Sequence, residues 1–159
     1  MTMHLIKHVN HRFDNAAAVF QFVTGGNALF TIESVQTGTR FTYSVRSSED
    51  NEQAKQSGRG VFFVSLLSGP NNETDFAYLG ILPKSDPATF RLTAKSRASE
   101  DAPSVKAFRW FWRQVCASRL PASVACWHEG RCGRCGRTLT VPSSIETGFG
   151  PECADKMGL

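Results

Sequence analysis

Three cysteines near the C-terminus carry the clearest chemistry in this sequence. Cys132 and Cys135 stand in Cys-Gly-Arg-Cys-Gly, and Cys153 follows in Gly-Phe-Gly-Pro-Glu-Cys. Two thiolates separated by two residues can bind one metal ion from a single tight turn. Structural Zn²⁺ sites take four sulfur or imidazole ligands in a tetrahedron. The spacing therefore predicts a structural Zn²⁺ ion that holds the C-terminal tail in its fold.

The fourth ligand of this site is expected upstream, because residues 154–159 contain no histidine or cysteine. His128 would complete a His-x3-Cys-x2-Cys-x17-Cys pattern, which gives a compact Cys₃His site. Cys126 would give Cys-x5-Cys-x2-Cys and is also geometrically possible. We prefer His128, because it directly precedes the loop that carries the first two thiols. The predicted ligands are His128, Cys132, Cys135 and Cys153.

The residues around the thiols predict how the tail is built. Pro151 suits the first turn of a helix and Glu152 favours its positive end, so Cys153 is expected in that turn. Residues 138–141 form a short strand pattern between the loop and this helix. A thiol-bearing loop, a short strand and a ligand-bearing helix make a module similar to a treble clef or a zinc ribbon. Such a short tail cannot bury a core of its own and needs the metal.

Composition and length place the chain among ordinary globular proteins. It has 159 residues, of which 41% are hydrophobic. Its five cysteines are an odd number, which suits a reducing compartment. The first residues lack the apolar stretch of a signal peptide, and no apolar run is long enough to span a membrane. We therefore expect a cytoplasmic protein without a membrane partner.

The rest of the sequence predicts an α+β fold. Five runs read as strands of an antiparallel sheet, at residues 28–35, 40–46, 61–67, 76–82 and 90–94. Helical spacing of Phe108, Phe111, Trp112 and Val115 predicts a long helix over 103–118 that packs on this sheet. We expect a sheet domain over residues 1–120 and a zinc module over residues 121–159.

Charge is unevenly distributed along the chain, whose net charge is +4. Residues 1–90 carry 7 Lys/Arg against 8 Asp/Glu, whereas residues 91–159 carry 11 against 6. A basic half favours an anionic partner such as nucleic acid. The candidate contacts lie on one helix face and on the loop that carries Cys132 and Cys135, which we call the metal loop. They are Lys106, Arg109, Trp110, Arg113, Arg131, Arg134 and Arg137. Alternatively, the helix residues form an ordinary solvated face, and the arginines of the loop compensate the charge of the thiolates.

No complete catalytic set is visible in the sequence. His128 and Glu129 begin like the zinc-protease motif, but the second histidine of that motif is missing. Four protein ligands would also leave zinc without an open position for water. We therefore expect a protein that is not an enzyme, with an enzyme of unrecognised type as an alternative.

Residues 132–153, which read Cys-Gly-Arg-Cys-Gly-Arg-Thr-Leu-Thr-Val-Pro-Ser-Ser-Ile-Glu-Thr-Gly-Phe-Gly-Pro-Glu-Cys, resemble the C-terminal module of an uncharacterised family. The family occurs in bacteriophages and prophages and is grouped only as a domain of unknown function. Its members share a His-x-Gly lead-in, which here is His128-Glu129-Gly130, so the resemblance supports His128 as a ligand. It implies a mobile-element origin and a zinc module but no activity.

These observations lead to two expectations about function. The first is a zinc-stabilised protein that binds nucleic acid or a nucleoprotein complex through its basic second half. The second, suggested by the resemblance to phage proteins, is an inhibitor that binds a host defence complex in the manner of an anti-CRISPR protein. The sequence does not predict an oligomeric state.

Overall fold

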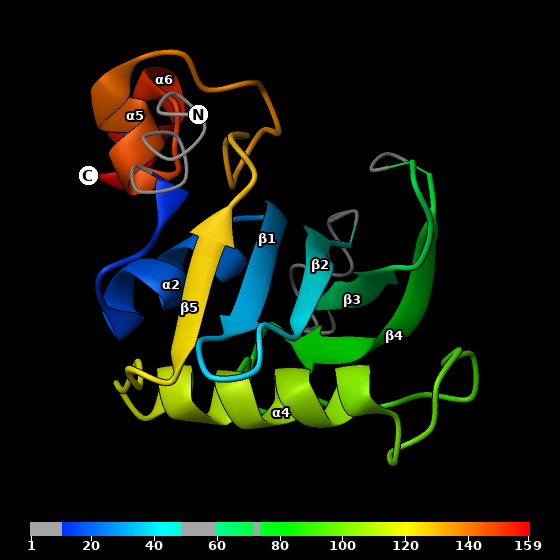
Figure 1. The fold of residues 1–159 in the computed structure, drawn as a ribbon. Helices are drawn as coiled ribbons and strands as arrows, with labels where there is room; N and C mark the ends of the chain where they lie inside the picture. The colour runs from blue at the N-terminus through cyan, green and yellow to red at the C-terminus, as the bar shows by residue number, and fades with distance from the viewer. Residues whose placement is uncertain (1–10, 49–59, 72–73) are drawn as a thin grey trace.

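A computed structural model describes residues 11–48, 60–71 and 74–159 of the chain (Figure 1). It contains a five-stranded antiparallel sheet in the order β4-β3-β2-β1-β5, which confirms the expected α+β class. The strands are β1 Asn27–Ser34, β2 Arg40–Ser47, β3 Val61–Leu67, β4 Phe76–Pro83 and β5 Val124–His128. The helices are α2 Ala16–Val23, α4 Pro103–Cys116, α5 Pro142–Thr147 and α6 Pro151–Met157. None of these helices in the described ranges combines the length and apolar character needed to cross a membrane.

Alternation of side chains gives the sheet two different faces. On β1, Ala28, Phe30 and Ile32 are buried, whereas Leu29 and Thr31 are only half-buried. The buried side chains join those of α2 and α4 in one hydrophobic core. In Figure 1, α2 lies behind β5 and β1, and α4 runs along one end of the sheet. No helix of the described residues is drawn in front of the strands, so the opposite face is turned towards the viewer.

Helix α4 contacts the buried face through aromatic side chains. The rings of Tyr43 and Phe108 lie 5.2 Å apart, and those of Phe30 and Phe111 lie 6.4 Å apart. The Tyr43 hydroxyl donates a hydrogen bond of 2.7 Å to the carbonyl oxygen of Ser104. The helix begins at Pro103, as the sequence predicts, and ends two residues before the expected position 118.

The expected strand over residues 90–94 is wrong. Only Arg91 pairs with β4, through a single bridge to Ile81, and a turn between Thr93 and Ser96 follows. The strand does not continue because the N–H of Thr93 donates to the Ser96 hydroxyl at 2.8 Å within this turn, while Phe90 packs against the ring of Phe108 at 4.9 Å. The fifth strand is instead β5, which pairs with β1. The sheet therefore extends past the boundary that we expected at residue 120.

Candidate metal centre

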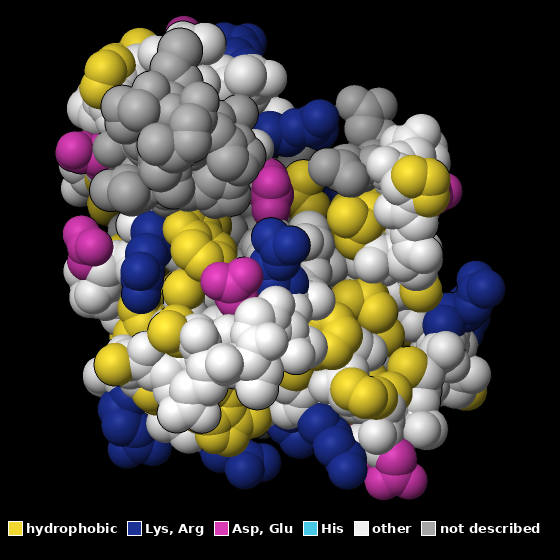
Figure 2. All heavy atoms as spheres, in the orientation of Figure 1, with side chains coloured by type: hydrophobic (Ala, Val, Ile, Leu, Met, Phe, Trp, Pro, Cys, Tyr) yellow, Lys and Arg dark blue, Asp and Glu magenta, His cyan; other side chains and the backbone are white. Residues whose placement is uncertain are grey.

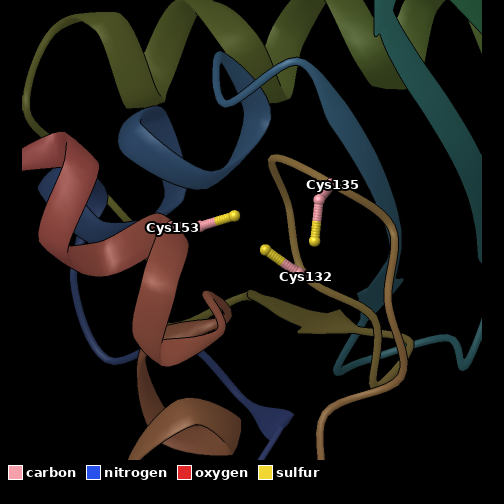
Figure 3. Close-up of side chains that lie close together, drawn as sticks. All are labelled: Cys132, Cys135 and Cys153. Carbon is pink, nitrogen blue, oxygen red and sulfur yellow. The ribbon is translucent and has the colours of Figure 1, made fainter.

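Three thiol groups from two separate segments converge at the C-terminal end of the fold. Cys132 and Cys135 lie in the loop after β5, Cys153 lies in the first turn of α6, and their side chains point towards a common centre (Figure 3). Their sulfur atoms all lie within 4.8 Å of one another. In a tetrahedral zinc site with Zn–S bonds of 2.3 Å, sulfur atoms are about 3.8 Å apart. A small closure would thus place all three on one ion, so these residues fit a metal.

Short-range hydrogen bonds shape the loop that carries the first two thiols. The backbone N–H of Gly136 donates to the carbonyl oxygen of Cys132 at 2.9 Å, and Gly136 adopts a φ of 78° that favours glycine. The N–H of Cys132 donates to the carbonyl oxygen of Arg137 at 2.8 Å. These bonds close a tight turn between Cys132 and Arg137, which brings Cys135 back over Cys132.

The surroundings of the thiols favour a thiolate at Cys132. Burial opposes its ionisation, but backbone N–H donors from Cys135, Gly150 and Arg134, together with the Cys135 thiol, outweigh burial and lower the Cys132 pKa to about 7. Burial raises the pKa of Cys153, although the Arg134 guanidinium, 3.8 Å from its sulfur, acts in the opposite direction. A bound cation would favour the thiolate at every one of the three positions.

His128 does not lie in this group of thiols. Its Nδ1 accepts a hydrogen bond from the N–H of Gly130 at 3.0 Å, so the ring proton is on Nε2 and is donated to the carbonyl oxygen of Ile145 at 2.5 Å. Both ring nitrogens are therefore used within the protein. Cys126 is buried in β5 and also lies outside the group. Among the described residues, the metal-ligating group consists of the three cysteines, without either expected fourth ligand.

His128 instead joins the tail to the sheet. It is 1% exposed at the end of β5 and its ring stacks on His11 at 4.5 Å, while its Nε2 holds Ile145 of α5. Burial lowers the pKa of His128 to about 4, the hydrogen bond to Ile145 acts in the opposite direction, and His11 adds to the lowering. The folded protein therefore keeps this imidazole neutral.

We expect the folded state to lose stability as the pH falls from 6.5 towards 4. The unfolded chain protonates His128 near its ordinary pKa of 6.5, whereas the folded chain binds this proton only near pH 4. The lowered pKa corresponds to a loss of about 3 kcal/mol across this window. Urea unfolding of the wild type and of His128→Gln, at several pH values, measures the effect. Acid releases a metal ion from both proteins alike, so this effect cancels in the comparison. An identical pH dependence of the two proteins would show that His128 does not cause the loss of stability.

The tail docks on α2 through a close approach that the sequence did not reveal. Phe149 is 1% exposed, and its ring centroid lies 5.8 Å from that of Phe22. A Cβ atom on Gly133 would lie 2.7 Å from the Phe22 ring, and one on Gly25 would lie 2.7 Å from the Gly133 carbonyl oxygen. The N–H of Asn27 donates to that carbonyl oxygen at 2.8 Å. The glycines after α2 and in the loop after β5 are the sequence signal that could have indicated this close approach of the tail to α2.

The expected partner-binding residues fall into two separate groups. Lys106, Trp110 and Arg113 are exposed on the outer side of α4, where Trp110 is 42% exposed. Arg131, Arg134 and Arg137 lie in the loop after β5. In Figure 1, α4 and this loop lie at opposite ends of the sheet. The seven residues therefore do not form one continuous surface.

Arg109 differs from its neighbours on α4, because its side chain is used within the fold. Its guanidinium donates to the carbonyl oxygen of Phe90 at 3.0 Å and to the Glu100 carboxylate at 2.7 Å. The same group lies 5.1 Å from the centroid of the Phe90 ring. Arg109 therefore attaches α4 to the segment that precedes it, and it is poorly placed to contact a partner.

A cavity of about 440 Å³ lies beside the thiols, between the metal loop and α6. Cys135 and Cys153 line it together with three cations and one acid, Arg134, Arg137, Lys156 and Glu152. Three hydroxyl side chains also line it: Thr138, Thr140 and Ser144. Within the described residues, no ion pair or hydrogen bond engages the side chain of Arg137 or Lys156. The cavity can therefore offer two uncommitted cations to an anion.

Comparison with known proteins finds a similar family for the tail alone. Residues 128–158 match a family described as "Family of unknown function (DUF6011)". The match confirms the expected resemblance of the tail to an uncharacterised domain, and it contains all three clustered cysteines. No curated protein and no solved structure matches the chain.

Proposed function

We propose that this protein is not an enzyme and that it binds nucleic acid with the help of a zinc-stabilised tail. The observation that carries the proposal is the basic cavity beside the thiols. Arg134 lies near the Cys153 sulfur and would offset the negative charge of three thiolates on one Zn²⁺. Arg137 and Lys156 remain for an outside anion, and the phosphates of nucleic acid are the anions that such cations commonly neutralise.

Zn²⁺ is the ion that we propose for the thiol group. Three thiolates from a tight loop and a helix start suit this borderline-soft ion and a treble-clef-like module. When bound, the ion would supply structural cross-linking between the loop after β5 and α6. Cys132, Cys135 and Cys153 are the ligands that we propose from the described residues.

Salt-dependent binding tests the proposed function. We expect a labelled single-stranded oligonucleotide to bind, with an affinity that falls steeply as the salt concentration rises. Replacing both Arg137 and Lys156 by glutamine should weaken binding and make the slope of log K against log salt shallower by about 1.4, since each phosphate contact on a single strand contributes about 0.7. Fluorescence anisotropy at several salt concentrations measures both quantities.

The matched control carries glutamine at Lys106 and Arg113, which removes the same charge from α4. If only this control loses affinity, the outer side of α4 is the contact surface and the cavity is not. If the wild type binds no nucleic acid, the proposed function is wrong. Stoichiometric binding to a host defence complex would then support the alternative function, an inhibitor of that complex. The resemblance to phage and prophage proteins suggests this alternative and a mobile-element origin.

A further inference from the structure

The sheet face opposite α2 and α4, which we call the open face, carries aromatic and basic side chains together. Figure 2 views the molecule in the orientation of Figure 1 and shows hydrophobic side chains on this side, with Lys and Arg side chains and some Asp or Glu side chains beside them. Phe63 is 43% exposed although β3 is an inner strand of the sheet. A large ring that is exposed on a regular strand does not contribute fully to the core and is available to contact a partner.

Strand register places an arginine directly beside this ring. Arg46 of β2 is the partner position of Phe63 on one side and of Asn27 on the other. One row further along, Ser65 pairs with Tyr78 of β4. The rings of Phe63 and Tyr78 lie 6.2 Å apart in an edge-to-face arrangement. The open face therefore presents two rings with a guanidinium next to them.

A small polar hollow of about 130 Å³ adjoins this group, at the junction of the sheet and the metal loop. Arg46 and Arg131 line it together with Asn27, Ser44 and Phe76, and none of the described residues in its lining is acidic. A hollow of this size with two guanidinium groups suits a single phosphate, which arginine can bind with two parallel hydrogen bonds.

Two acidic side chains belong to β1 and to the residue after β5, and neither lines the hollow. Glu33 pairs with Arg40 at 3.5 Å, towards the far end of β1 and β2. Glu129 accepts a hydrogen bond from the Thr31 hydroxyl. Glu129 keeps its negative charge in this bond, but it does not line the hollow. Among the described residues, the lining of the hollow is therefore basic and complementary to one phosphate.

We propose that the open face binds single-stranded nucleic acid, with a phosphate in the hollow and an unpaired base stacked on Phe63. The inference rests on the proposed function, since it names the form of nucleic acid and adds a second contact surface to the cavity beside the thiols. A single strand is the occupant because its bases can turn outwards and stack on exposed rings, whereas the bases of a duplex are covered by their neighbours. Arginines beside the rings supply the backbone contacts.

Two aromatic variants test the stacking contact. Phe63→Ala should weaken binding of labelled oligothymidylate about tenfold, because a base–aromatic stack of this kind typically contributes that much. Trp110→Ala is the matched control: its ring is 42% exposed, against 43% for Phe63, but lies on α4. It should change the affinity less than about twofold. Phe63→Trp should restore binding, and its added fluorescence should be quenched when the strand binds.

Two charge variants test the phosphate contact. Arg46→Gln should reduce the slope of log K against log salt by about 0.7, whereas Arg113→Gln on α4 should leave it unchanged. Circular dichroism and metal content establish that each variant is folded. If the wild type binds single strands while Phe63→Ala and Arg46→Gln bind equally well, the inference is overturned and the proposed function stands. Tighter binding of a duplex of the same length also overturns it, and binding of neither form overturns both proposals.

Discussion

The Cys132→Ser protein is expected to lose its metal ion and to unfold after residue 128, while the five strands stay paired. Serine does not replace a thiolate as a zinc ligand at neutral pH, and Cys132 is fully buried beside Cys135 and Cys153. Few large apolar side chains of the tail are buried without the metal, mainly Leu139 and Phe149. Structural zinc supplies roughly 10–16 kcal/mol in small metal-dependent domains, so losing one ligand should exceed what these side chains contribute.

Metal analysis and hydrogen exchange measure this outcome. The wild type should retain metal after dialysis and protect amides in the tail, and Cys132→Ser should do neither. Cys116→Ser is the matched control, because this thiol lies on α4 outside the cluster. Unaltered metal content in Cys132→Ser would mean that this thiol is not a ligand. Protected tail amides without metal would mean that the ion does not hold the tail.

Phe149→Ala should destabilise the folded protein by about 3–5 kcal/mol while the metal remains bound. A buried phenylalanine leaves a cavity when it is truncated, and this one packs against Phe22 of α2 and lies close to Gly25 and Gly133. The three thiols are not altered, so the ion should still hold the loop to α6. The expected result is a tail that keeps its metal but attaches weakly to the sheet domain.

Chemical unfolding and metal analysis together check this separation of roles. Val141→Ala is the control, because Val141 is 44% exposed and its truncation should change the free energy of unfolding by less than about 0.5 kcal/mol. A wild-type free energy of unfolding in Phe149→Ala would show that the aromatic contact with α2 does not anchor the tail.

Local patterns were enough to predict much of this fold. Alternating and continuous apolar runs predicted β1 to β4 within one residue at each end, because each of these strands pairs with the next one along the chain. The helical spacing of Phe108, Phe111 and Val115 likewise identified the buried side of α4. The spacing of the thiols predicted the cluster, because a pair two residues apart is already half of a metal site.

Long-range pairing explains most of what the sequence did not reveal. β5 becomes a strand by pairing with β1, almost one hundred residues earlier, and this pairing turns Cys126 and His128 into the core. A histidine just before a thiol pair indicates a ligand when read locally, yet its environment is set by Gly130 and Ile145. The sequence similarly predicts an exposed cation at Arg109, whereas in the folded protein its guanidinium is bonded to Phe90 and Glu100.

The rings and arginine of the open face illustrate the same limit. Arg46 and Phe63 lie on different strands, and neither residue is unusual in its own segment. Only the register of β2 and β3 makes them neighbours beside a hollow that the metal loop completes. The charge counts along the chain therefore predicted contact residues on α4 and on the metal loop, and none on the sheet.

Native mass spectrometry of the protein purified from a reducing cytosol tests the account most directly. Cys132, Cys135 and Cys153 should hold one zinc ion per chain, and X-ray absorption should show three sulfur ligands at about 2.3 Å. A metal-free protein whose tail is nevertheless ordered would contradict the central claim.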